Sequence, residues 1–342
     1  MSSIIRRVGI PLYEQQMDNV AEAIRNGELV LGRHLELLRE RLAQLFGKRY
    51  VALTANGFSA LFVALKAALA QPRSILTAPA STCHAMTNAI RAAGHQPIFA
   101  DMEVLAASLP AAGDNAPDTV AIIPDHFGLL AEANRNRAPG SRLLIEDASQ
   151  SFISCSRERG PADAIVLSFY PTKLVNGIDG GALLTDDADL YERARRLICY
   201  SDQHRYESDG RYNFRMNNVN AALALGTLDH LSEIAARLQS LYAVLSDAFR
   251  RKGTRHLMAR GQEVASRFIV VAEDEADKEA WLRHFELAGI QAASELEFIC
   301  PPERVPSFPV AGQLVRTSFS VPFHPLLSDA ELERMRAAIG AR

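Results

Sequence analysis

Residues 164–173 read Ala-Ile-Val-Leu-Ser-Phe-Tyr-Pro-Thr-Lys, and residues 176–181 continue with Asn-Gly-Ile-Asp-Gly-Gly. The first four residues form an apolar, strand-like segment. Lys173 follows its end, between a proline that stops regular structure and glycines that let a ligand approach the backbone. An amine held there can form a Schiff base with an aldehyde once burial or a nearby cation lowers its pKa. A loop lysine is usually a solvated surface residue, so the interpretation depends on the residues upstream.

A second strand end lies upstream, at Asp147. Residues 142–147 read as a buried strand that closes with two acids, Glu146 and Asp147. Ligands of open α/β sheets bind outside the carboxyl ends of the strands, so Asp147 and Lys173 are expected near one another. Pyridoxal phosphate chemistry needs such a pair: a lysine for the Schiff base and a carboxylate that keeps the pyridinium nitrogen protonated. The alternative for Asp147 is a helix N-cap, because Ala148-Ser149-Gln150 could begin a helix.

A third segment has the pattern of a phosphate site. Residues 50–54 read as a strand, Ala55-Asn56-Gly57-Phe58-Ser59 as a turn of mostly small residues, and residues 60–70 as a helix rich in Ala and Leu. A strand, a turn and a helix N-terminus together bind anions through free backbone N–H groups and the helix dipole. Ser168 could add a hydroxyl to the same phosphate. Many α/β units share this pattern, so it supports the lysine and the aspartate without deciding the chemistry.

Taken in order, these segments resemble the DegT/StrS family of pyridoxal phosphate-dependent sugar aminotransferases of fold type I. The specific blocks are Glu-Asp-Ala-x-Gln at 146–150 and Ser-Phe-x-x-x-Lys at 168–173. The supporting blocks are Leu31-Gly32, Ala55-Asn56-Gly57 with Ser59-Ala60-Leu61, Ala78-Pro79 with Thr82 and Asn88, His126-Phe127-Gly128, Asp179-Gly180-Gly181, Tyr212-Asn213-Phe214-Arg215-Met216 and His324-Pro325-Leu326-Leu327.

The resemblance implies a role for each matching position. Lys173 would form the internal aldimine and carry the proton between Cα and C4′, and Asp147 would pair with the pyridinium nitrogen. Gln150 would contact the side of the ring that bears the phenolic oxygen. Asn213 would reach the phosphate from the neighbouring subunit, which would make the active site a property of a homodimer. The residues expected to bind the cofactor are Asn56, Gly57, Phe58, Ser59, Cys83, His84, Asp147, Gln150, Ser168, Lys173 and Asn213.

Two departures from the family pattern mark a divergent member. The family usually carries Gly-Thr at the phosphate turn, where this chain has Gly57-Phe58, so a hydroxyl donor is lost. The aromatic residue that stacks on the pyridine ring is expected four residues after Pro79, and that position is Cys83. Cys83 could pack on the ring as a small polarizable group, or the neighbouring His84 could stack as a neutral imidazole. We favour His84, and its alternative is an ordinary, partly buried histidine.

Three further residues are candidates with open alternatives. Arg215 could contact a substrate carboxylate or diphosphate, or it could brace the dimer interface. His324 could touch the substrate, and its alternative is a structural role. His126 lies at another strand end and could orient the cofactor through Asp147, or it could satisfy a local hydrogen bond.

Composition is typical of a soluble enzyme. The 342 residues are 48% hydrophobic with a net charge of -3, and there is no basic patch to bind nucleic acid. No apolar run approaches the ~20 residues needed to span a bilayer, and the N-terminus lacks the apolar core of a signal peptide. The histidines show no zinc pattern. The four cysteines lack CxxC spacing, which indicates free thiols in a reducing cytoplasm.

The periodicity predicts an α/β protein with two domains. Seven strands alternating with helices favour a mostly parallel, mixed sheet in a large domain. We expect an N-terminal arm and this large domain over residues 1–230, and a linking helix with a small α+β domain over 231–342. Expected strands of the large domain are 50–54, 74–78, 96–100, 119–123, 142–146, 164–168 and 181–185. Expected helices are 13–26, 33–46 and 60–70, and a long helical stretch follows residues 221–225 and ends at about 251. In the small domain we expect a strand at 267–271, a helix at 278–288, a strand at 317–321 and a helix at 329–339.

The function that these patterns predict is amino transfer. An amino acid, expected to be glutamate, would convert the cofactor to pyridoxamine phosphate, which would then aminate a keto sugar, expected to be nucleotide-linked. One alternative is the same reaction on a cyclitol or another non-nucleotide ketone. The other is a pyridoxal phosphate-binding protein without catalysis, which the missing threonine and the missing aromatic residue motivate.

Overall fold

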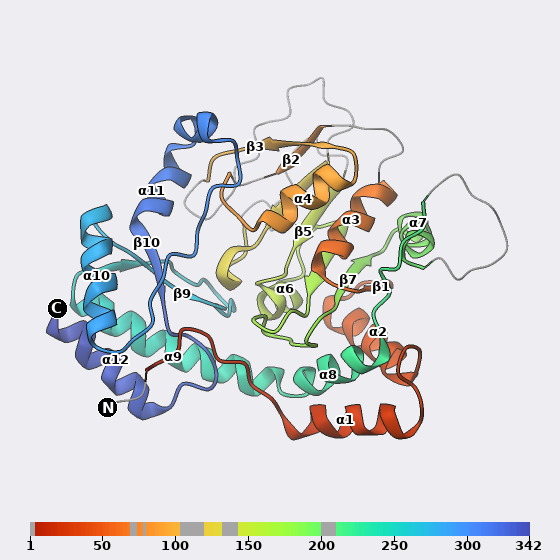
Figure 1. Ribbon diagram of the computed structural model, residues 1–342, viewed down its shortest axis with the longest axis horizontal. Coiled ribbons are helices and arrows are strands. Elements are labelled where there is room, and N and C mark those ends of the chain that lie inside the picture. Colours follow the sequence, from red (N-terminus) through yellow and green to blue (C-terminus); the bar gives the residue numbers. More distant parts are fainter. Residues whose placement is uncertain (1–3, 69–73, 78–79, 103–119, 132–142, 200–209) are drawn as a thin grey trace.

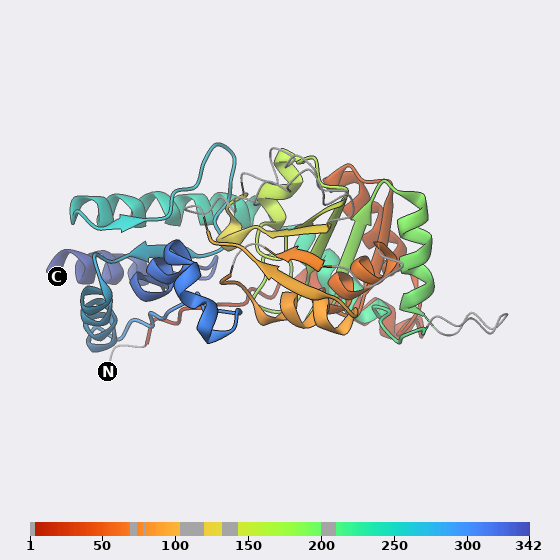
Figure 2. The same cartoon turned by 90° about the horizontal axis from the view of Figure 1, so that it is seen from above.

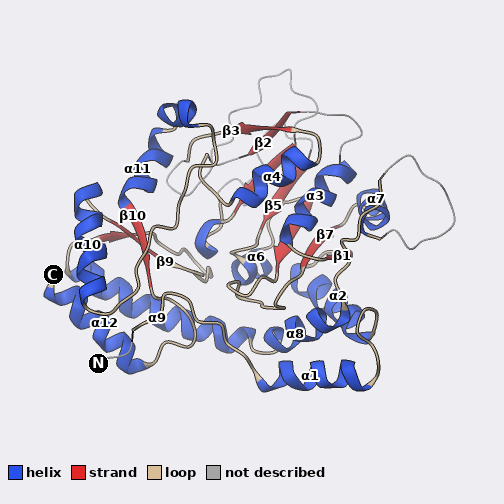
Figure 3. Cartoon of the chain, in the orientation of Figure 1, coloured by secondary structure: helices blue, strands red, loops and turns tan. Residues whose placement is uncertain are grey.

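The computed structural model of the chain describes residues 4–68, 74–77, 80–102, 120–131, 143–199 and 210–342. Figures 1 and 2 show a large domain with a twisted central sheet between layers of helices, next to a smaller domain that contains the C-terminus. Figure 3 shows the helices and strands in the same view. In the described residues, no helix is both long and apolar enough to cross a membrane.

The central sheet has seven strands in the order β1-β7-β6-β5-β4-β2-β3. β7 is antiparallel to β1 and β6, and the other neighbours are parallel. The predicted mixed, mostly parallel sheet is therefore confirmed. Residues 78, 119 and 142, which the predicted strands included, lie outside the described residues. The strands are β1 (Tyr50–Thr54), β2 (Ser74–Thr77), β3 (Gln96–Phe99), β4 (Val120–Pro124), β5 (Leu143–Asp147), β6 (Ala164–Ser168) and β7 (Gly181–Thr185).

Helices cover both faces of this sheet, because its strands alternate two sets of apolar side chains. Ile122 and Leu183 face a core with α3, α4 and α7, whereas Ile123 and Leu184 face a core with α2, α6 and α8. The helices are α1 (Glu14–Arg25), α2 (Arg33–Phe46), α3 (Gly57–Ala68), α4 (His84–Ala92), α6 (Phe152–Glu158), α7 (Ala188–Ile198) and α8 (Asn218–Leu228), with a 3-10 turn η1 (His126–Gly128) after β4.

The long helical stretch predicted to follow residues 221–225 ends at Arg251, as predicted, and a separate helix precedes it. α8 ends at Leu228, and α9 (Leu231–Arg251) begins after a turn at Asp229 and His230. The His230 ring stacks on the ring of Tyr13, with centroids 3.8 Å apart. This contact joins the turn to the chain that leads into α1. We propose that the boundary between the large and the small domain lies at residue 230.

The small domain is α+β, as predicted. Its three strands form an antiparallel sheet in the order β10-β9-β8. The start of the described chain joins this domain, because Ile5 donates its N–H to Gly289 O at 2.9 Å and accepts from Gln291 N at 3.0 Å. The elements are β8 (Arg255–His256), β9 (Phe268–Val271), α10 (Glu275–Leu287), a 3-10 helix η2 (Pro302–Ser307), α11 (Pro309–Thr317), β10 (Ser318–Val321) and α12 (Asp329–Ala341).

Candidate active site

The Lys173 loop is closed by its own backbone. Lys173 N donates to Tyr170 O at 2.8 Å, and Gly177 N donates to Phe169 O at 2.9 Å, directly after the end of β6. Burial lowers the pKa of the Lys173 ammonium, while the carboxylate of Asp147 acts in the opposite direction. Desolvation therefore moves this lysine toward the neutral amine that can act as a nucleophile and a base.

The lysine lines a cavity of about 390 Å³ at the carboxyl ends of the strands. The cavity brings together eight of the predicted site residues: Asn56, Gly57, Phe58, Cys83, Asp147, Gln150, Ser168 and Lys173. Ser59, His84, Asn213, Arg215 and His324 do not line it. Residues from four strand ends that are far apart in the sequence thus meet at one edge of the sheet.

One end of the cavity has the features of an anion site. α3 begins there with Gly57, and a Cβ built on Gly57 would lie 2.8 Å from Ser168 Cβ and 3.1 Å from Ser168 Oγ. Glycine is therefore required for the helix N-terminus to approach this hydroxyl. Asn56 Oδ1 accepts from both the N–H and the hydroxyl of Ser59, each at 2.9 Å. Ser59 is thus buried in the helix cap, and Ser168 is the hydroxyl that lines the cavity.

Phe58 does not fill this end of the cavity. Its ring stacks with Phe62 at a centroid distance of 6.4 Å and packs against the core that contains α3. The side chain that replaces the family's threonine therefore adds an apolar wall, and the anion must rely on backbone N–H groups and Ser168.

Asp147 and Gln150 also line the cavity. Asp147 is the last residue of β5, and its Oδ1 accepts from Ser149 N at 3.1 Å. The helix-cap alternative for Asp147 is wrong, because α6 begins at Phe152 with Ser151 at its cap. Gln150 Oε1 accepts from Phe127 N at 3.0 Å, and this bond orients the amide.

His126 is buried near Asp147, at the start of η1. Burial lowers the pKa of its imidazole to about 4, while the carboxylate of Asp147 and the backbone at Ser81 and Pro124 oppose the shift. A neutral imidazole places no positive charge beside Asp147, so the carboxylate is available to a cation in the cavity.

The structure brings Cys83 to the cavity and keeps His84 out of it. Cys83 occupies the N-cap of α4 and is exposed on the cavity wall. His84 is the first helical residue, its side chain is 61% exposed, and its Nε2 lies 3.9 Å from Glu297 Oε2. Of the two candidates for packing on a ring, Cys83 lines the cavity and His84 does not, so the choice between them stays a prediction. Pro79, from which this spacing was counted, lies outside the described residues.

The segment around Asn213 and Arg215 runs beside the end of β1. Ala55 N donates to Phe214 O at 2.6 Å, and Thr54 forms an antiparallel bridge with Arg215. Asn213 is exposed, and Arg215 Nη1 lies 3.7 Å from Cys199 Sγ. In a single chain neither side chain reaches the cavity.

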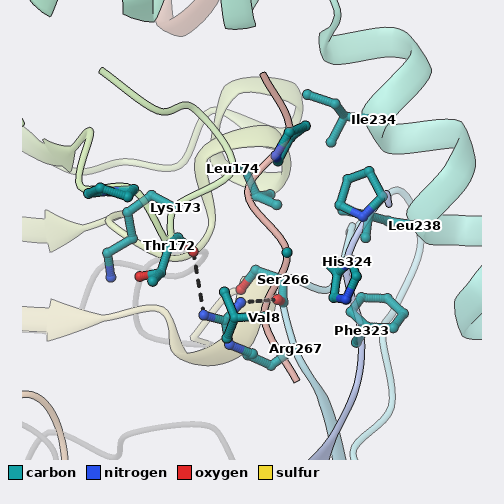
Figure 4. Close-up of a pocket in the computed structure, with 14 residues that line it drawn as sticks. Val8, Thr172, Lys173, Leu174, Ile234, Leu238, Ser266, Arg267, Phe323 and His324 are labelled. Atoms are coloured by element: carbon teal, nitrogen blue, oxygen red, sulfur yellow. Dashed lines mark hydrogen bonds between the residues drawn. The ribbon is translucent and has the colours of Figure 1, made fainter. Parts of the chain in front are cut away.

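His324 lines a second, smaller cavity that shares Thr172 and Lys173 with the first (Figure 4). Its Nε2 lies 3.0 Å from Arg6 O, and a Cβ on Gly9 would lie 2.4 Å from the ring. His324 therefore holds the N-terminal arm against the small domain. Arg267 lines the same cavity. Sequence reasoning missed it, although a basic residue at the start of an apolar strand was a visible signal.

Three comparisons place the chain among known proteins. The sequence profile of the DegT/DnrJ/EryC1/StrS aminotransferase family matches residues 12–340. UDP-2-acetamido-2-deoxy-3-oxo-D-glucuronate aminotransferase of Pseudomonas aeruginosa is 26% identical over 341 residues, which cover 94% of either chain.

Solved structures agree in fold. PseC of Helicobacter pylori, an aminotransferase involved in the biosynthesis of pseudoaminic acid, matches with a TM-score of 0.87 at 18% identity, over 99% of both chains. The aminotransferase TlmJ of Streptoalloteichus hindustanus matches with a TM-score of 0.84 at 22% identity, also over 99% of both chains. The profile spans nearly the whole chain, and the residues that carried the resemblance meet in one cavity. The chain belongs to the DegT/DnrJ/EryC1/StrS aminotransferase family.

Proposed function

We propose that this aminotransferase moves an amino group from glutamate to the keto group of a nucleotide-linked sugar. The observation that carries the proposal is the cavity in which Lys173, Asp147 and the N-terminus of α3 meet. The Pseudomonas relative acts on a nucleotide-linked oxo sugar by its name, and this supports the class of acceptor. A cyclitol or another non-nucleotide ketone is the alternative that the test below must separate.

The family uses pyridoxal phosphate, and the residues present fit it. When bound, the cofactor supplies an aldehyde that takes up the amino group and a ring that withdraws electrons. Gly57, Phe58 and Ser168 would hold the phosphate, since the missing Cβ of Gly57 leaves room beside the Ser168 hydroxyl. Asp147 would hold the ring nitrogen in its protonated form. Cys83 would pack on the ring face in place of an aromatic residue.

Lys173 and its surroundings would carry the proton transfers. Because burial lowers the pKa of Lys173, the amine would accept the proton from the donor's Cα and deliver it to C4′ of the cofactor. Gln150, fixed by its bond from Phe127 N, would orient the ring's oxygen side. Neutral His126 would keep the charge of Asp147 directed at the cofactor.

We further propose a homodimer in which each cavity is completed by the partner subunit. Large apolar side chains are exposed around α1 and its following turn, including Leu31 at 70% and Met17 at 60%. Covering such a surface with a second copy would remove apolar area from water. Asn213 would then reach the phosphate, and Arg215 the substrate, of the partner's cavity.

Mixing two inactive proteins tests this arrangement. Lys173→Ala and Asn213→Ala homodimers should each lose activity, and a mixture allowed to exchange subunits should recover part of it, because some cavities then combine intact residues from both chains. A mixture that stays at the sum of the two separate activities argues against a shared site.

The four cysteines are free thiols, which supports our placement of the protein in the reducing cytoplasm.

The first test of the reaction is an absorbance spectrum of the protein loaded with pyridoxal phosphate, before and after glutamate is added. We expect the amine form of the cofactor to replace the aldehyde form, and Lys173→Ala to lose the covalent attachment that borohydride traps on the chain. A panel of keto acceptors then separates nucleotide-linked sugars from cyclitols. A bound cofactor that no amino acid converts would indicate a protein without catalysis.

A further inference from the structure

Gln16 of α1 is fully buried and uses both ends of its amide in hydrogen bonds. Its Oε1 accepts from Tyr13 N at 2.9 Å, and this bond closes the first turn of α1. Its Nε2 donates to Leu223 O and to Thr227 Oγ, each at 3.0 Å, in the neighbouring helix α8. A buried amide is costly to leave without partners, so these bonds fix α1 against α8, beside which it lies (Figure 1).

The same hydrogen bonds continue into the loop that carries Lys173. The Thr227 hydroxyl has one proton, and Asn176 O at 3.1 Å is a closer acceptor than Leu223 O at 3.4 Å. Gln16 Nε2 also lies 3.4 Å from Asn176 O, and Asn176 is itself buried. A chain of hydrogen bonds therefore runs from α1 through α8 to a residue that follows the lysine by three positions.

This contact holds the end of the loop that returns from the sheet. At the first end, Phe169 N donates to Gly180 O at 2.9 Å, directly after β6. At the second end, Gly177 N donates to Phe169 O at 2.9 Å, and a Cβ built on Gly177 would lie 2.9 Å from Asn220 O of α8. The base of the loop therefore lies directly against α8.

The position of the Lys173 amine depends on this backbone. Within the part of the chain that the structure describes, Lys173 Nζ has no hydrogen-bond partner that would hold it independently of the loop. A covalent bond to an aldehyde forms only when the amine meets the carbon in a reactive geometry, and a displacement of about 1 Å can cost about 100-fold in rate. A group that fixes the base of the loop thus controls the reactivity of the amine.

We propose that Gln16 is a positioning residue for Lys173, and that it acts through Thr227 and Asn176. It does not line the cavity, so it acts on the cofactor only through the lysine loop. The bond that the loop must favour joins Nζ to the aldehyde carbon of the cofactor, and the aldehyde oxygen leaves as water. The inference rests on the proposed role of Lys173 in holding the cofactor.

The test compares two forms of the cofactor. Pyridoxal phosphate and pyridoxamine phosphate share the phosphate and the ring, but only the aldehyde form can bond to Lys173. Loss of a positioning contact should therefore weaken the aldehyde form alone, whereas a cavity that is merely loosened should weaken both forms. The two dissociation constants are measured by fluorescence titration of the cofactor-free protein. Borohydride reduction followed by mass spectrometry identifies the lysine that carries the cofactor.

The variants break the chain of hydrogen bonds at two places. Gln16→Met and Thr227→Val each remove a donor and keep the approximate size of the side chain, whereas Thr227→Ser keeps the hydroxyl. Asn19→Leu is the matched control. Asn19 of α1 also donates to a carbonyl of α8, that of Ala222 at 3.2 Å, and its other bond, from Gln15, lies within α1.

We expect Gln16→Met and Thr227→Val to raise the dissociation constant of pyridoxal phosphate by roughly 10-fold, as the loss of one buried hydrogen bond predicts. The constant of pyridoxamine phosphate should not change in either variant. Thr227→Ser and Asn19→Leu should leave both constants unchanged.

Other outcomes overturn the inference. Equal losses for the two cofactor forms, the same losses in Asn19→Leu, or unchanged constants would each show that Gln16 does not position the lysine. If Gln16→Met does not fold by circular dichroism, Thr227→Val and Thr227→Ser decide by the same criteria. A wild type that binds pyridoxal phosphate without a trapped bond at Lys173 refutes the proposed role of the lysine. A wild type with that bond, together with unaffected variants, refutes only the role of Gln16.

Discussion

His126 makes the stability of the protein depend on pH in a way that can be calculated. Burial lowers the pKa of this imidazole from its ordinary 6.5 to about 4. In the unfolded chain His126 takes up a proton as the pH falls below 6.5, but in the folded protein it stays neutral until about pH 4. The depressed pKa therefore contributes stability that is present above pH 6.5 and is lost as the pH falls toward 4.

The size of this effect follows from the two pKa values of His126, because they set how much of the imidazole is protonated in the unfolded and in the folded protein. From pH 7.5 to pH 5, linkage of the two pKa values predicts that His126 lowers the free energy of unfolding by about 2 kcal/mol, and at pH 4 by about 3 kcal/mol. His126→Asn removes the titrating group and keeps a polar amide. The substitution also changes packing, but that contribution does not vary with pH and cancels in the comparison.

The assay is denaturant unfolding of both proteins at pH 7.5, 6 and 5, with the cofactor removed and circular dichroism as the signal. We expect the wild-type advantage over His126→Asn to shrink by about 2 kcal/mol between the first and last pH. Equal denaturant slopes for the two proteins check that the same transition is compared. A difference that stays constant across this range refutes the claim that His126 is neutral in the folded protein.

Three further perturbations test the site. Gly57→Ala places a Cβ 2.8 Å from Ser168 Cβ, and it should weaken pyridoxal phosphate binding in a fluorescence titration by about 10-fold or more, because overpacking costs about 1–3 kcal/mol. Ile178 is exposed and has a φ of 66°, a left-handed backbone conformation that is strained for a β-branched residue. Ile178→Asn should relieve about 1 kcal/mol of this strain and raise the midpoint of thermal unfolding. An unchanged midpoint would contradict the backbone strain. Burial and Asp125 raise the pKa of Glu146, so stability is lost as the pH rises above 4.5, and Glu146→Gln should melt progressively higher than wild type between pH 5 and pH 8.

The local sequence was sufficient to predict the strands and the two principal residues of the candidate site, Lys173 and Asp147. The alternation of apolar residues in segments such as 164–168 is a property of the strand itself, so β6 has the predicted bounds. Lys173 and Asp147 were predictable because each follows its own strand, and the ends of neighbouring strands meet in an α/β sheet. The break between α8 and α9 was not predictable from the same patterns, because the apolar spacing continues through Asp229 and His230.

The amino-acid sequence by itself determined the α/β architecture, the family, and which lysine and aspartate line the cavity, because strand periodicity and motifs are encoded in neighbouring residues. Only the tertiary structure decided between candidate site residues that the local sequence pattern could not distinguish. Asn56 uses the Ser59 hydroxyl in a helix cap and so leaves Ser168 to the cavity. The start of α4 turns Cys83 inward and His84 outward. Arg267 contacts Thr172 across 95 positions of sequence, and a contact of that separation depends on how the two domains pack.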